Sequence, residues 1–100
     1  MKQLISISEC VGTHEDERGA FEVCATADAE YDETTNRISI RLECFLRPIS
    51  SPSFEPCHEA WLPTPQVVKE TVSEEEGDAI AKDVFHSWVR RVQQSIPKAH

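Results

Sequence analysis

Two stretches of alternating side chains constrain the fold of this chain more than any other feature. From Phe21 to Tyr31 the apolar and small residues fall at odd positions, and from Ile38 to Leu46 they fall at even positions. Alternation with a period of two is typical of strands that have one buried face and one solvated face. The sequence therefore predicts two β-strands, over about 21–31 and 37–47, which form a hairpin around a turn at 33–36.

The charged residues predict how these two strands pair. When Asp32 lies opposite Arg37, all apolar positions fall on one face and three carboxylates on the other face meet arginines. The expected pairs are Asp32–Arg37, Asp28–Arg41 and Glu22–Arg47. Opposed charges contribute about 0.2–1 kcal/mol each, and a slip of one residue would move every apolar side chain to the charged face. We therefore interpret these charges first as a solvated sheet face.

Further strands are expected on both sides of this hairpin. Residues 3–11 alternate except at Glu9, which indicates an edge strand or a bulge. Residues 12–19 begin and end with glycine and read as a long charged hairpin loop. A proline-rich connection at 48–65 follows, with short apolar segments in and after it that are candidates for additional strands.

A C-terminal helix over about 74–96 is the clearest single element. Ser73 followed by Glu76 forms a capping box, and Pro97 ends the run. Its apolar side chains recur at helical spacing at Ala81, Val84, Phe85, Trp88 and Val92.

Two further features concern how this helix is placed. Gly77 lies in the apolar stripe and indicates a close approach to the alanine row of the first alternating strand. Arg90 and Arg91 are expected in the closing turns, where they complement the helix dipole. We therefore predict an α+β fold over residues 1–100: one domain, an antiparallel β-meander of three to five strands with one long C-terminal α-helix packed on one face.

Composition excludes several classes of function. Eighteen acidic residues against ten basic ones give a net charge of −8, which is the wrong sign for a general nucleic-acid binder. The sequence has no secretory signal and no apolar run long enough to cross a bilayer, so no membrane role is expected. The four cysteines form no C-x-x-C motif, so we expect free thiols in a reducing compartment and a cytoplasmic location.

Cysteine and histidine side chains are the main candidates for metal or catalytic chemistry, since the acidic stretch 14–17 lacks the ligand spacing of a calcium loop. Cys57 and His58 are adjacent, but neighbouring residues of a strand point to opposite faces and make a poor nucleophile–base pair. A zinc site would add further ligands from Cys24, Cys44, His14 and His86. None of these forms the closely spaced ligand pair of structural zinc sites. We therefore expect no catalytic site, metal or cofactor, and keep a Cys/His enzyme or metal-binding protein as the weakest alternative.

The remaining hypothesis is a small protein that acts through protein–protein contact and forms a homodimer. Phe54, Trp61 and Leu62 are the predicted contact residues, because aromatic side chains framed by proline make effective interface anchors. The alternative is an acidic inhibitor that mimics phosphates and binds a basic groove. It would present Glu22, Asp28, Glu30, Asp32 and the charged loop Glu15–Glu17.

Overall fold

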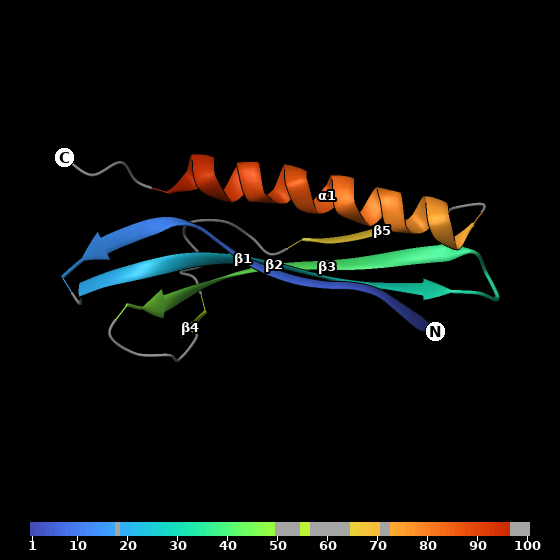
Figure 1. Ribbon diagram of the computed structural model, residues 1–100, viewed down its shortest axis with the longest axis horizontal. Helices are drawn as coiled ribbons and strands as arrows, with labels where there is room; N and C mark the ends of the chain where they lie inside the picture. Colours follow the sequence, from blue (N-terminus) through green and yellow to red (C-terminus); the bar gives the residue numbers. More distant parts are fainter. Residues whose placement is uncertain (18, 50–54, 57–64, 71–72, 97–100) are drawn as a thin grey trace.

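The structure, a computed structural model, describes residues 1–17, 19–49, 55–56, 65–70 and 73–96. Its elements are β1 (Lys2–Asp16), β2 (Gly19–Asp32), β3 (Arg37–Pro48), β4 (Glu55–Pro56), β5 (Gln66–Glu70) and α1 (Glu74–Ser95). All strand pairs are antiparallel, and the strand order is β1-β2-β3-β4. On β3, β4 pairs with residues 45–46 and β5 pairs with residues 37–41. The helix lies lengthwise over one face of this sheet (Figure 1). The predicted α+β meander with one C-terminal helix is confirmed.

The central hairpin has the predicted register. Asp32 pairs with Arg37, Asp28 with Arg41, and Glu22 with Arg47 as Cα partners. The chain reverses between β2 and β3 with Asn36 at φ 52°, in the left-handed region that asparagine tolerates better than most residues. The side-chain oxygen of Asn36 accepts a 2.8 Å hydrogen bond from the Tyr31 hydroxyl, which ties the turn to the core.

The predicted loop over 12–19 is wrong, because β1 continues to Asp16 and pairs with the start of β2 at Gly19. The register of β1 shifts between Cys10 and Gly12, close to the break in parity at Glu9. This bulge inserts one residue and restores pairing, so that His14 faces Phe21. Polar residues suit the strand because β1 is an edge strand. A second shift, between residues 3 and 5, has no signal in the sequence.

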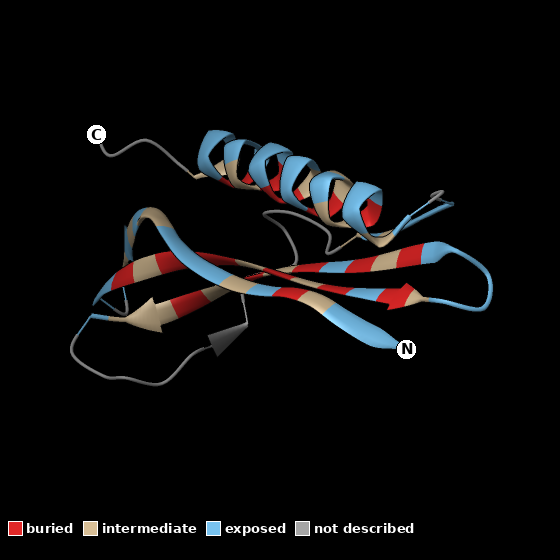
Figure 2. Cartoon of the chain, turned by 45° about the vertical axis from the view of Figure 1, so that its right-hand side comes forward, coloured by how far each residue is buried: buried red, intermediate tan, exposed pale blue. Residues whose placement is uncertain are grey.

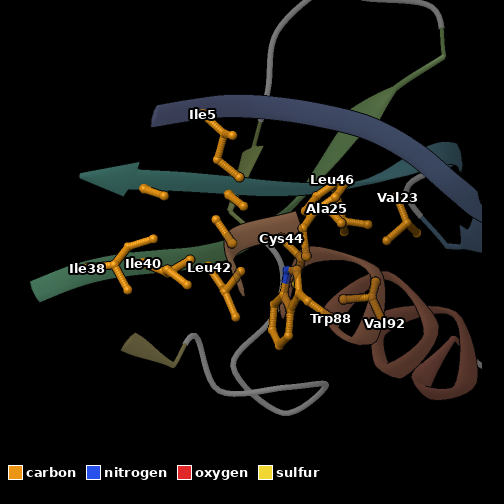
Figure 3. Close-up of a cluster of buried hydrophobic side chains, with 14 of the residues drawn as sticks. Ile5, Val23, Ala25, Ile38, Ile40, Leu42, Cys44, Leu46, Trp88 and Val92 are labelled. Atoms are coloured by element: carbon orange, nitrogen blue, oxygen red, sulfur yellow. The ribbon is translucent and has the colours of Figure 1, made fainter. Parts of the chain in front are cut away.

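The core lies between α1 and the sheet, and buried residues alternate with more exposed ones along β2 and β3 (Figure 2). Ala25, Ala27 and Ala29 of β2 are 0% exposed and leave room for the helix to approach the sheet. Trp88 is 2% exposed. Figure 3 shows its ring on α1 directed toward Leu42 and Cys44 of β3. The small residues of β2 and the larger ones of β3 therefore form one core with the apolar stripe of α1.

The helix begins as predicted and ends slightly differently. Ser73 is the N-cap, and its hydroxyl accepts a 3.1 Å hydrogen bond from the backbone N–H of Glu76. At the other end Ile96 is the C-cap, and the last turn contains no basic residue. Arg90 and Arg91 lie in the closing turns as predicted, but they precede the last turn, so their effect on the helix dipole is weaker than expected.

Gly77 is buried in the helix, but the alanine row is not what lies closest to it. A Cβ atom at this position would meet Leu4 at 3.4 Å, Ile38 at 3.6 Å and Tyr31 at 3.7 Å, all at side-chain atoms. These are ordinary van der Waals distances, so the position has room for a methyl group. The close backbone approach that the sequence indicated at Gly77 is therefore not required by the packing.

We expect Gly77→Ala to raise the free energy of unfolding by about 0.5–1 kcal/mol, because alanine loses less backbone entropy in a helix. Urea denaturation of the two proteins measures this difference. Ala79→Gly is the matched control, because Ala79 is exposed in the same helix and should lose a similar amount. A loss of stability in Gly77→Ala would mean that the site is too tight for a methyl group.

Candidate functional site

The contact residues predicted from the sequence cannot be placed. Phe54, Trp61 and Leu62 lie outside the described residues, and so do Cys57 and His58. The described candidates for a site are the sheet faces, the sheet edges and the helix.

The predicted acidic face lies on the side of the sheet opposite α1, and arginines compensate part of it. Glu22 forms an ion pair and a hydrogen bond with Arg47, and this contact raises the pKa of the arginine. A carboxylate oxygen of Asp28 lies 4.0 Å from Arg41 Nη2, and the other accepts a 3.5 Å hydrogen bond from the Gln3 amide. Two of the three predicted acid–base pairs are thus present in the structure.

The third pair, between Asp32 and Arg37, is not formed although the two residues are Cα partners. Arg37 Nη2 lies 3.6 Å from Glu70 Oε1 instead, because β5 pairs with this end of β3. Asp32 accepts a 2.9 Å hydrogen bond from the backbone N–H of Thr34. This bond is the main reason that the pKa of Asp32 is lowered. Asp32 therefore serves the turn rather than a charged pair across the hairpin.

The remaining candidates for metal or catalytic chemistry are dispersed. His14 lies within β1, with Nε2 3.2 Å from Asp16 Oδ2 and its ring centroid 6.5 Å from that of Phe21. Cys44 is buried in the core under α1, whereas His86 is exposed on the helix. Within the described parts of the chain, no three His, Cys, Asp or Glu side chains are grouped to hold a metal ion.

A groove of about 350 Å³ lies between α1 and β5, and sequence reasoning missed it. Its lining consists of Leu42, Pro65, Val67, Lys69, Asp83, Val84, Ser87, Trp88 and Arg91. The groove exists because β5 pairs with β3 next to α1. No local pattern in the sequence indicates that β5 pairs with this strand.

The outer edge of β1 is the longest strand edge of the sheet. The strand has fifteen residues and, among the described residues, pairs only with β2. Near the bulge two of its carbonyl groups are occupied: Val11 accepts a 3.2 Å hydrogen bond from the Gln93 amide, and Gly12 accepts a 3.6 Å one from the Cys10 thiol. The stretch before the bulge, Leu4–Glu9, has no such side-chain bond in the described structure, and we call it the β1 edge segment.

Side chains of the β1 edge segment are incompletely covered. Ile5 is 8% exposed, while Leu4 and Ile7 are only partly buried against the core. Ser6 and Ser8 are exposed on the opposite face of the strand. The segment thus combines main-chain pairing groups with an apolar row that a neighbouring strand would cover.

Charged residues stand at both ends of the β1 edge segment. Lys2 Nζ lies 2.5 Å from Glu74 Oε1 of α1, and this contact is the main reason that the pKa of the lysine is raised. Glu9 is exposed at the other end. The segment therefore has a positive charge just before its start, at Lys2, and a negative charge at its end, at Glu9.

Comparison with protein-family models, with curated proteins and with solved structures found no match to this chain. None of the helices in the described structure is long and apolar enough to cross a membrane. The site is accordingly assigned from geometry and chemistry alone.

Proposed function

We propose that this protein acts through protein–protein contact inside the cell, and that it self-associates by pairing the β1 edge segment with that of a second copy. The observation that carries the proposal is the long edge of β1 with its partly covered apolar row. An unpaired edge strand is a template for strand addition, because its N–H and C=O groups bind another chain without any change of fold. Cysteines that are free thiols suit an intracellular location.

The flanking charges favour an antiparallel pair of two identical segments. In that orientation Lys2 of one copy approaches the partner's Glu9, and the same contact recurs by symmetry. A two-fold axis at Ser6 sets Ile5 opposite the partner's Ile7 on the helix side of both sheets. This alignment joins the two apolar rows and extends the sheet across the dimer.

The test is a disulfide cross-link at the axis, in a background with Cys10→Ser and Cys57→Ser. With Ser6→Cys, the two new thiols lie on residues directly opposite each other, where Cα atoms of paired strands are about 4.5–5.5 Å apart. That separation suits a disulfide. We expect a covalent dimer under mild oxidation and a concentration-dependent dimer of the unmodified protein in sedimentation at micromolar concentration.

Ser8→Cys in the same background is the matched control, because it is exposed on the same strand and face. Ser8 lies two residues from the two-fold axis on each copy. The two thiols of this variant would therefore be about 14 Å apart along the strands. Equal cross-linking of both variants, or a monomer at every concentration, would contradict the proposed pairing.

The acidic inhibitor remains a second candidate because of the net charge of −8. Arginines compensate Glu22 and Asp28 of its predicted surface, which weakens the field that a basic groove would recognise. Retention of the protein on an immobilised polycation only at low salt, together with a monomeric state, would favour this candidate over self-association.

A further inference from the structure

Cys10 and Cys24 stand directly opposite each other on neighbouring strands. They are Cα partners in the antiparallel β1–β2 pair. Opposed residues of such a pair direct their side chains to the same face of the sheet. Here that face is the one away from α1, since the neighbouring residues Val23 and Ala25 are in the core.

The spacing of the two strands suits a covalent bond. Opposed Cα atoms of an antiparallel pair are about 4.5–5.5 Å apart, and disulfides span Cα distances of about 4.4–6.8 Å. Both cysteines are free thiols in the structure. Cys44, the third described cysteine, lies on the other face of the sheet in the core, so it is separated from this pair by the sheet itself.

The two thiols differ in their surroundings. Cys10 is exposed at the edge of the sheet, whereas Cys24 is 4% exposed. Burial raises the pKa of Cys24, and the neighbouring Cys10 raises it further. Since the thiolate is the reactive form, an external reagent meets Cys10 first and Cys24 reacts only at short range.

We propose that Cys10 and Cys24 form a reversible thiol–disulfide site that links β1 to β2, with a low-molecular-weight disulfide as the oxidant. The Cys10 thiolate attacks one sulfur of oxidised glutathione, which forms a mixed disulfide and releases one glutathione. The Cys24 thiolate then attacks the Cys10 sulfur, which forms the Cys10–Cys24 bond and releases the second glutathione. Two electrons pass from the cysteines to oxidised glutathione, and the two thiol protons leave with the products.

This inference stands apart from the proposed self-association. In the symmetric pairing around Ser6, Cys10 lies four residues from the axis, far from the same residue of the second copy. The bond is therefore expected within one chain, whether the protein is a monomer or a dimer.

The experiment treats the full chain with oxidised glutathione and maps the product by trypsin digestion and mass spectrometry. Cleavage after Lys2, Arg18 and Arg37 places Cys10 and Cys24 in separate peptides, 3–18 and 19–37. Cys44 and Cys57 share one peptide, 42–69, because Pro48 blocks cleavage after Arg47. We expect peptides 3–18 and 19–37 to be joined, with the loss of two hydrogen atoms from the chain.

Single substitutions separate the two steps. Cys24→Ala should stop at a glutathione adduct on Cys10, and Cys10→Ser should leave Cys24 unmodified. Cys44→Ala is the matched control and should form the same cross-link as the unchanged protein. Circular dichroism of each variant establishes that the strands are still present.

Three results would overturn the proposal. The first is a stable glutathione adduct on Cys10 of the unchanged protein. The second is a bond from Cys10 to peptide 42–69 or to another copy of peptide 3–18. The third is no reaction at Cys10 in the folded protein while the urea-unfolded chain reacts.

Discussion

Trp88→Ala is expected to lower the free energy of unfolding by about 3–5 kcal/mol, the range observed when a large buried aromatic side chain is truncated. Trp88 is 2% exposed between α1 and the sheet. Its indole N–H also donates a 3.0 Å hydrogen bond to the Glu43 carbonyl oxygen of β3. The substitution therefore removes apolar contact and a helix-to-sheet hydrogen bond together. Urea denaturation followed by circular dichroism measures the loss.

Two further variants separate these contributions. Trp88→Phe keeps much of the aromatic contact but has no N–H donor. It should lower the free energy of unfolding less than Trp88→Ala does, and the Glu43 carbonyl loses its hydrogen bond from the indole. Gln94→Ala changes an exposed residue of the same helix and should alter stability by less than about 0.5 kcal/mol. If Trp88→Ala were as stable as Gln94→Ala, the helix would not be docked as described.

Ala27→Leu is expected to destabilise the protein by about 1–3 kcal/mol, the usual effect of overpacking a core. Ala27 is 0% exposed, and its Cα partners are Ile7 and Leu42 on the two flanking strands. Because Ala27 belongs to the core between α1 and the sheet, we expect the larger leucine side chain to push the two apart. Thermal and urea unfolding measure the loss, and increased dye binding by exposed apolar surface would report the displaced helix.

Ala20→Leu is the matched control for this prediction. It is the same substitution in the same strand, at an exposed position. We expect a change of less than about 0.5 kcal/mol. Equal effects at Ala20 and Ala27 would show that leucine disturbs β2 itself and not the contact between helix and sheet.

Local patterns in the sequence were sufficient to predict the central hairpin and the helix. The β2–β3 register follows from two independent signals, apolar parity and opposed charge, which agree at one alignment. The start of α1 follows from Ser73 and Glu76, whose bond is formed within one turn. Each of these features depends on residues that are close in sequence or repeat with a fixed period.

Features that depend on distant residues were predicted less well. Arg37 pairs with Glu70 because β5 joins the far edge of β3, and no local pattern places β5 there. Residues 12–16 read as a loop because an edge strand in water carries the same polar residues as a turn. The bulge after Cys10 changes the parity of everything that follows it, so alternation alone could not identify the continuation.

The candidate site was predictable only in outline. The break at Glu9 correctly indicated an edge strand or a bulge, and β1 has both features. The β1 edge segment itself, and the opposition of Cys10 to Cys24, required the register between β1 and β2. Phe54, Trp61 and Leu62 remain predictions from the sequence.

Nearest-neighbour pairing of β1, β2 and β3 has a consequence for the order in which the chain folds. Each of these strands pairs with the next one along the sequence, so loop closure costs little entropy and hairpin formation is fast. Docking of α1 instead closes a longer loop, because the segment between β3 and α1 spans residues 49–73 and includes β4 and β5. The meander is therefore expected to assemble first, and the arrival of α1 to complete the transition to the native state.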